Sequence, residues 1–373
     1  MGAGVCLADV VTDLAFFQDA GLYDPGADDA HEVRDLLYRL EDLGWSPEEV
    51  VGALENCDLA ELAASASLRS MPELSIAEAA AQLEMDVDEF DELRRTAGLA
   101  PRPIDGPAFT KADISAFLSL QQGKEMFTTE EANHFARVLG SSMARIADAA
   151  VSLFLIDVEG PLRDAGGTDF DLVRQNFMAA AALDGVAAAL DPLLRMHLED
   201  AIHRSRESRL PGEDVIISRM AVGFVDLVGF TAFSETSSAA EIGTLVRVFE
   251  DTAYDLVAEN GGRVVKLIGD EVMFVAVDGE VACRTAMALI ERFRGDRVTP
   301  RAGLAYGELL ARGGDYYGPI VNLASRLGDL AVRGEILATP ELADLCPSLE
   351  FEPAGRRQLK GFAEPVALVS ISS

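Results

Sequence analysis

The sequence predicts two domains of different class: an all-α domain over residues 1–207 and an α+β domain over residues 215–373, joined by a linker at 208–214. Up to about residue 207, apolar residues recur at three- and four-residue spacing, which is the period of a helix. After residue 215, short apolar runs alternate with helix-length segments, which is typical of helices packed on one sheet. The chain has 373 residues, enough for two separate hydrophobic cores.

The first half reads as a series of helices. Ser46–Glu49 and Thr128–Glu131 have the form of helix starts, with acids in the first turn. A further helical pair is expected over 171–207, split near Pro192, because proline interrupts a helix. A polar stretch ending at Pro211-Gly212 suits the linker. The expected helices before the pair are 31–43, 48–64, 76–83, 90–99, 114–120 and 130–155.

Residues 75–99 have the outline of a helix-turn-helix, which would indicate a DNA-binding module. However, the second helix opens with four acids in five positions, 88–92. Acidic side chains cannot lie against phosphates, so this segment is interpreted as a packing element.

The second half alternates strands and helices. Strands are expected over 215–225, on both sides of the Gly269-Asp270 turn within 263–277, and over 300–306, 307–312, 335–338 and 365–371. Helices are expected over 239–259, 281–294 and 321–331.

Composition restricts the partners. The formal net charge is −32, of which residues 1–212 carry −23 (39 acids, 16 bases) and residues 213–373 carry −9 (24 acids, 15 bases). So acidic a chain repels nucleic acid and anionic lipid. No uninterrupted apolar run of about 18 residues exists, so no membrane span is expected. Four scattered cysteines and the lack of a basic segment before the first apolar stretch indicate a cytoplasmic protein.

Two aspartates carry most of the chemical information. Asp226, in the segment 223–231, lies at the end of an apolar, strand-like run, and Asp270 sits in the Gly-Asp turn within 266–274, 44 residues later. Carboxylates at strand ends beside glycine-containing turns are well placed to hold divalent cations near phosphate oxygens. The pair predicts a two-metal site for phosphoryl or nucleotidyl transfer. A third segment, 315–326, adds polar groups that such a site needs.

With these segments in order, residues 216–373 resemble the catalytic domain of the class III nucleotidyl cyclases. The resemblance implies a ferredoxin-like α+β domain that dimerises head to tail, with active sites across the interface. It implies that Asp226 and Asp270 bind two divalent metals, Mg²⁺ or Mn²⁺, and that Asn322 and Arg326 are catalytic. It also implies substrate-binding roles, which fall on Lys266, Asp315 and Lys360.

Three further substrate-binding candidates are Phe230, Thr231 and Arg312. The first two open the helix that follows 224–229, where free backbone N–H groups can face phosphates. Arg312 is a candidate phosphate contact.

The residues favour ATP over GTP. Asp315 can accept a hydrogen bond from the exocyclic amine of adenine, and Lys266 can donate to a ring nitrogen, whereas guanine presents the reversed edge. Lys266 and Asp315 are therefore the predicted base-reading residues. The chain carries both these and the predicted metal-binding residues, so two copies can form a symmetric homodimer with two equivalent sites.

The helical domain suggests regulation. The chain resembles, in layout, a bacterial cyclase subgroup with an all-helical N-terminal domain, some members of which respond to pH. All four histidines precede residue 204, and His197 and His203 lie just before the linker. Histidine titrates near neutrality, so we expect activity to rise on acidification through about pH 6–7, with protons or an unidentified ligand as the signal.

Two other functions stay open at this point. The first is a diguanylate cyclase. The turn at 268–271 only loosely resembles the signature turn of those enzymes, and Lys266, Asn322 and Arg326 argue against this function. A catalytically silent sensor or scaffold dimer has no need of the complete set of site residues.

Overall fold

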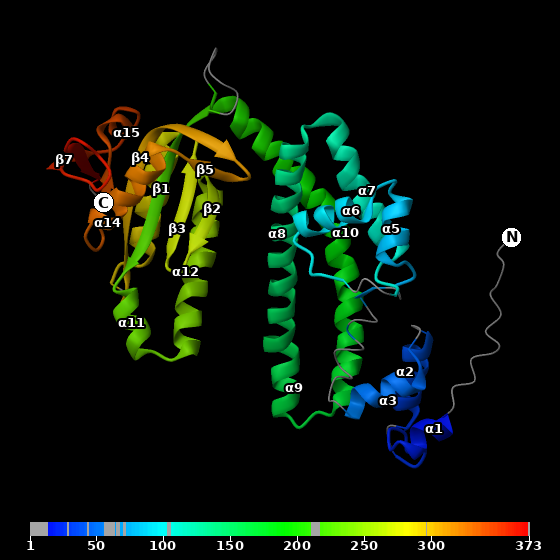
Figure 1. Cartoon of the computed structure of the whole chain (residues 1–373). Coiled ribbons are helices and arrows are strands. Elements are labelled where there is room, and N and C mark those ends of the chain that lie inside the picture. The colour runs from blue at the N-terminus through cyan, green and yellow to red at the C-terminus, as the bar shows by residue number, and fades with distance from the viewer. Residues whose placement is uncertain are drawn as a thin grey trace. The chain divides into compact units, whose positions relative to one another are not determined.

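The computed structural model describes residues 14–27, 30–42, 45–55, 64, 68–69, 72–102, 106–209, 217–295 and 297–371 (Figure 1). The chain divides into two compact units, 1–194 and 195–373, each described here by itself. The predicted domain limits at 207 and 215 stay predictions of the sequence, and the linker residues 210–214 lie outside the described residues.

The first unit is helical. Its elements are α1 (Leu14–Asp19), α2 (Ala30–Asp42), α3 (Pro47–Glu55), α5 (Ile76–Gln82), α6 (Val87–Thr96), α7 (Lys111–Met126), α8 (Thr129–Phe154), a π-helical turn (Leu155–Glu159), α9 (Gly160–Asp164) and the first part of α10 (Asp169–Glu207). The expected break at Pro192 is absent, because α10 continues through the proline as one helix of 39 residues.

Two small cores stabilise this unit at separate places. In one, Phe90 of α6 packs edge-to-face against Phe109 and Phe117, with ring centroids 5.0 Å away in each case. In the other, the start of α10 buries Val173 and Phe177 among residues of α1–α3. Because α6 buries its apolar face and leaves Asp88 and Glu89 exposed, the interpretation of 75–99 as a packing element is consistent with the structure.

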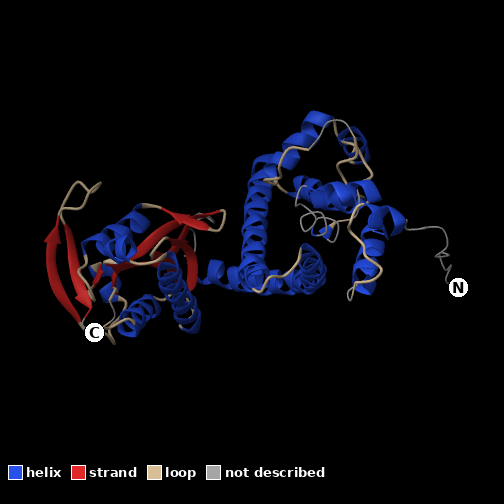
Figure 2. Ribbon diagram, turned by 90° about the horizontal axis from the view of Figure 1, so that it is seen from below, coloured by secondary structure: helices blue, strands red, loops and turns tan. Residues whose placement is uncertain are grey.

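The second unit is built on one mixed sheet. Its strands are β1 (Ile217–Val228), β2 (Arg263–Ile268), β3 (Glu271–Ala276), β4 (Thr299–Arg312), β5 (Asp315–Tyr317), β6 (Ile336–Ala338), β7 (Phe351–Arg357) and β8 (Val366–Ile371). The strand order is β2-β3-β1-β4-β6-β8-β7, with β5 added to β4. Figure 2 shows the strands of this unit in red and its helices in blue. Only β4 and β6 run parallel among these pairs; the other pairs are antiparallel.

The helices of the second unit are α11 (Phe230–Thr236), α12 (Ala239–Glu259), α13 (Gly279–Arg292), α14 (Pro319–Leu330) and α15 (Pro340–Asp344), besides the last part of α10. The two segments expected at 300–306 and 307–312 form one continuous strand, β4. The expected strand at 215–225 is β1, whose described part starts at Ile217.

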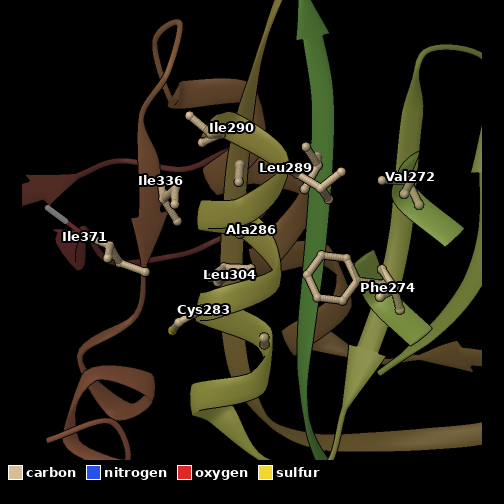
Figure 3. Close-up of a cluster of buried hydrophobic side chains, with 14 of the residues drawn as sticks. Val272, Phe274, Cys283, Ala286, Leu289, Ile290, Leu304, Ile336 and Ile371 are labelled. Carbon is tan, nitrogen blue, oxygen red and sulfur yellow. The ribbon is translucent and has the colours of Figure 1, made fainter. Parts of the chain in front are cut away.

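Alternation along the strands gives the sheet two apolar faces, since successive side chains point to opposite sides. Ala221 and Val225 of β1 pack with α12 and α13, while Val222 and Phe224 pack with α14. Figure 3 shows the first core, where Ala286, Leu289 and Ile290 of α13 lie against Phe274, Leu304 and Ile336 of the sheet. The sheet is therefore fixed on both sides, and the site residues lie at strand ends and on α14.

Length and composition mark two helices of the described chain, 129–164 and 170–207, as apolar enough to cross a membrane. No span was expected because the sequence has no uninterrupted apolar run of sufficient length. These two helices contain a few charged residues among many apolar ones, so their average hydropathy is high although the runs are interrupted. The same two properties are found in helices that pack against protein, so they do not by themselves indicate a membrane.

Candidate active site

The sheet brings the two predicted metal-binding aspartates together. Asp226 lies near the end of β1, in register with Glu271 of β3, and Asp270 occupies the β2–β3 turn immediately before Glu271. The backbone N–H of Leu227 donates to the carbonyl of Asp270 across 3.3 Å. The tight turn is possible because Gly269 adopts φ 66°, a conformation that favours glycine.

Burial and the neighbouring carboxylates both disfavour ionisation of the acids at this site. Burial, and next the charge of Asp226, raise the pKa of Asp270. Burial and the charges of Asp226, Asp329 and Asp270 raise the pKa of Glu271 to about 7. A bound cation would relieve this repulsion, so the observed cluster fits a divalent metal.

The described residues contain no group of three or more His, Cys, Asp or Glu side chains arranged to hold a metal by themselves. Two carboxylates can hold a divalent ion when water and substrate phosphates complete its coordination. Asp226 and Asp270 are the residues that would hold it.

Arg301 is a site residue that the sequence reasoning missed. It lies on β4 in register with Asp226, and its Nε and Nη2 donate to Asp226 Oδ2 at 3.0 and 2.8 Å. Its Nη1 donates to the carbonyls of Asp329 and Ala331 at 2.7 and 3.3 Å. An arginine in an apolar strand could have signalled this role, since a charge there needs a partner.

The predicted base-reading residues also meet. Lys266 on β2 donates to Asp315 Oδ2 at 2.6 Å, although the two residues are 49 positions apart in sequence. The other oxygen, Oδ1, accepts from the backbone N–H of Tyr316 at 2.8 Å, which fixes the carboxylate. Both side chains remain partly exposed, 38% for Lys266 and 26% for Asp315, so a nucleobase edge can reach them.

α14 presents the two predicted catalytic residues on one exposed face, because Asn322 and Arg326 are four residues apart. Arg326 forms an ion pair with Asp329 at 2.8 Å. The helix sits directly on the sheet at Gly303, where a Cβ atom would lie 2.1 Å from the backbone nitrogen of Gly328.

The remaining predicted residues are more dispersed. Phe230 opens α11 and packs partly into the core beside α12, whereas its neighbour Thr231 is exposed. Arg312 lies at the tip of β4, in register with Asp315, and Lys360 is exposed in the turn between β7 and β8. Within the described residues, no hydrogen bond or ion pair joins Lys360 to the other predicted site residues.

His197 and His203 border a pocket of about 1090 Å³ within the second unit. The same pocket is lined by Arg312 and Asp315, so the two histidines and two of the predicted substrate-binding residues share one cavity wall. This proximity was not visible in the sequence, because the residues are more than 100 positions apart.

Comparison with known proteins agrees with this geometry. Residues 216–369 match the family model described as the adenylate and guanylate cyclase catalytic domain. An adenylate cyclase of Glutamicibacter nicotianae is 30% identical over 282 residues, covering 70% of this chain and 68% of that protein. An uncharacterised protein of Mycobacterium tuberculosis, Rv2212, is 33% identical over 359 residues, covering 95% of this chain and 93% of that protein.

The similarity extends into the helical half. The pH-sensitive adenylate cyclase MT1302 of Mycobacterium tuberculosis is 27% identical over 307 residues, covering 77% of this chain and 75% of that protein. The crystal structure of the adenylyl cyclase CyaB from P. aeruginosa is 26% identical, with a TM-score of 0.39, over 42% of this chain and 96% of that one. The chain is thus an enzyme of the class III adenylate and guanylate cyclase family, with a helical N-terminal region.

Proposed function

We propose that this enzyme converts ATP to 3′,5′-cyclic AMP and pyrophosphate. The observation that carries the proposal is the Lys266–Asp315 pair, held at 2.6 Å with both side chains partly exposed. An acceptor carboxylate beside a donor ammonium complements the adenine edge, which offers an amine and a ring nitrogen. Guanine would set its carbonyl oxygen against the carboxylate, and such a mismatch of polar groups is strongly disfavoured.

In the proposed reaction, the ribose 3′-hydroxyl loses its proton and its oxygen attacks the α-phosphorus, while the bond from that phosphorus to the bridging oxygen of the β-phosphate breaks. Two divalent cations, Mg²⁺ or Mn²⁺ at Asp226 and Asp270, would lower the pKa of the hydroxyl and neutralise the phosphates. Asn322 orients the ribose and Arg326 faces the charge that develops on the phosphates. Lys360, on an exposed turn, contacts the triphosphate.

We further propose that the active enzyme is a head-to-tail homodimer, with the metal-binding residues of one copy facing the base-reading residues of the other. Within the described part of one chain, no hydrogen bond or ion pair links Lys266 or Asp315 to Asp226 or Asp270. A two-fold arrangement would then create two equivalent sites. We propose a cytoplasmic location, supported by Cys283 and Cys346 being free thiols.

Regulation by protons is the proposed role of the helical half, with His197 and His203 as the titrating groups. Their charge would act on the pocket that they share with Asp315. The other charged or titratable groups that line it are Asp200, Arg204, Tyr254, Arg263, Arg312 and Tyr316. The proposal expects activity to rise as the pH falls through about 7 to 6, and to do so less in His197→Ala and His203→Ala.

A product assay tests these proposals. Full-length protein is incubated with ATP or GTP and with Mg²⁺ or Mn²⁺, at pH 5.5 and pH 8, and the nucleotides are resolved by chromatography. Cyclic AMP that disappears in Asp226→Ala supports the function, and Arg284→Gln, an exposed residue of α13, serves as the matched control. No cyclic nucleotide from a folded dimer under any of these conditions would refute it.

A further inference from the structure

The pocket of about 1090 Å³ in the second unit is walled by segments that lie far apart in the sequence. The end of α10, the C-terminal end of α12, the turn before β2 and the hairpin of β4 and β5 all contribute residues. Gly261, Gly262, Gly313 and Gly314 are among them and add no side chains that would fill the space. Small-molecule pockets usually have volumes of about 300–1,000 Å³, so this one is large enough for a small organic ligand.

The charge of the pocket is opposite to that of the chain. Arg204, Arg263 and Arg312 line it, in a protein with a formal net charge of −32. Two aspartates also line it, but Asp315 already has a lysine partner and Asp200 is exposed on α10. A local excess of positive charge in so acidic a protein attracts anions.

Two of these arginines carry charges that no carboxylate neutralises. Within the residues that the structure describes, neither Arg204 nor Arg263 forms an ion pair. Arg263 is held by neutral groups instead: its Nη2 donates to the carbonyl of Gly314 at 2.8 Å, and its guanidinium lies 5.8 Å from the ring centroid of Tyr316. Both arginines are partly buried, where a charge without a counter-ion is costly. An anionic ligand in the pocket would neutralise them.

Ser208 adds an unused donor to the same wall. It is 4% exposed, and its hydroxyl makes no hydrogen bond in the described part of the chain. Its backbone is fixed, because its N–H donates to the carbonyl of Arg204 at 3.0 Å and its carbonyl accepts from the N–H of Arg219 at 2.8 Å. Buried polar groups are almost always paired, so an unpaired hydroxyl at a pocket wall indicates a ligand or water that completes it.

We infer that this pocket binds a phosphomonoester, a phosphate group carried by a small organic molecule. Two guanidinium forks and a hydroxyl offer several donors, and a phosphate presents three terminal oxygens and close to two negative charges at pH 7. A carboxylate carries one charge and would leave one guanidinium without a partner. The exposed ring of Tyr254 lies on the pocket wall and can pack against the organic part of the ligand.

The pocket differs from the predicted substrate site. Among the described residues that line it, Arg312 and Asp315 belong to the predicted substrate-binding set, whereas Lys266 and the two predicted metal-binding aspartates do not line it. A ligand held by Arg204 and Arg263 would therefore occupy a second site on the enzyme, and its binding requires no catalysis.

Binding of ribose 5-phosphate to the full-length protein tests this site, by calorimetry at pH 8 in EDTA. At this pH histidine is neutral, so the binding does not depend on protonation of His197 or His203. Arg204→Gln is compared with Arg206→Gln, an exposed residue of the same helix that does not line the pocket. Ribose and inorganic phosphate are titrated as controls, and a non-hydrolysable ATP analogue is titrated separately with Mn²⁺ in place of EDTA.

Ribose 5-phosphate should bind the parent protein and Arg206→Gln equally, and Arg204→Gln about tenfold or more weakly, because a charge-assisted hydrogen bond is lost. No binding by the parent, equal binding by the two variants, or binding of ribose with the same affinity would overturn the inference. Inorganic phosphate that binds as tightly would remove the organic part of the ligand.

The ATP analogue separates the two sites. It should bind Arg204→Gln as it binds the parent protein, which also shows that the variant is folded. A parallel loss of the analogue and of ribose 5-phosphate would place Arg204 in the substrate site and overturn the second site. Because these are binding measurements, they remain decisive if the proposed cyclase activity is absent.

Discussion

Arg301 holds Asp226 in place by donating two hydrogen bonds to a single oxygen, Oδ2, at 2.8 and 3.0 Å. The second oxygen of Asp226 takes part in neither of these bonds. The same guanidinium is anchored by the carbonyls of Asp329 and Ala331 at the end of α14. One arginine thus connects Asp226, the predicted metal-binding carboxylate, to the helix that carries Asn322 and Arg326.

Arg301→Gln is expected to lower kcat by about 10- to 100-fold, because a charge-assisted hydrogen bond contributes about 1.5–3 kcal/mol. The loss should appear as weaker Mn²⁺ binding by calorimetry, since Asp226 would no longer be oriented. Arg301→Lys keeps the charge but not the planar fork, so it should recover only part of the activity. The surface variant Arg284→Gln should behave like the parent, and equal activity in Arg301→Gln would rule out this role.

Removal of the divalent metal with EDTA is expected to abolish cyclic AMP formation, and added Mg²⁺ or Mn²⁺ should restore it. Asp270→Asn should lose activity by about 100-fold or more even with metal present. In metal-free protein, however, the same variant should melt at an equal or higher temperature, because burial and the charge of Asp226 disfavour the ionised Asp270. A clearly lower melting temperature would indicate a structural role instead.

The Lys266–Asp315 pair should control the choice of nucleotide. Asp315→Ala removes the acceptor for the adenine amine and leaves Lys266 unpaired, so the ratio of kcat/KM for ATP over GTP should fall by about 10- to 100-fold. A steady-state comparison of both substrates measures this ratio. Glu308→Ala, on the same hairpin but paired with Arg219, is the matched control and should leave the ratio unchanged.

The acidic cluster should make metal-free stability depend on pH. Burial raises the pKa of Glu271 from 4.5 to about 7, so between these values the folded protein holds a proton that the unfolded chain has released. The free energy of unfolding should therefore decline as the pH rises from about 4.5 to 7. Denaturant titrations in EDTA should show a smaller decline in Glu271→Gln than in the parent. Identical slopes would contradict this assignment.

Much of the catalytic unit could be predicted from the sequence because its signals are local. Asp226 and Asp270 end apolar runs, and Asn322 and Arg326 have helical spacing, so their placement follows from backbone geometry alone. The roles assigned to them stay predictions until activity is measured.

Other features depend on tertiary structure and could not be predicted in this way. Arg301 became recognisable only when the β1–β4 register placed it opposite Asp226. The break expected at Pro192 did not form, because a proline removes one N–H but can be carried within a long helix. The bounds of β4 were also missed, since Tyr306 and Gly307 resemble a strand end in sequence while the long pairing with β1 continues through them.

Gly303 should be essential for seating α14 on the sheet. A Cβ atom there would lie 2.1 Å from the nitrogen of Gly328 and 2.2 Å from the carbonyl oxygen of Ala324, both backbone atoms that cannot rotate away. Gly303→Ala should therefore lower the free energy of unfolding by about 1–3 kcal/mol or more, as overpacking does. The matched control is Gly243→Ala in α12, where a Cβ meets nothing within 4 Å and should stabilise the helix by about 0.5–1 kcal/mol.

Chemical denaturation measures both changes in the free energy of unfolding. Because α14 carries Asn322 and Arg326, Gly303→Ala should also reduce kcat under conditions where the variant remains folded. A neutral Gly303→Ala would show that α14 can shift away from β4 without cost, and would remove the reason for linking the sheet to the catalytic face of that helix.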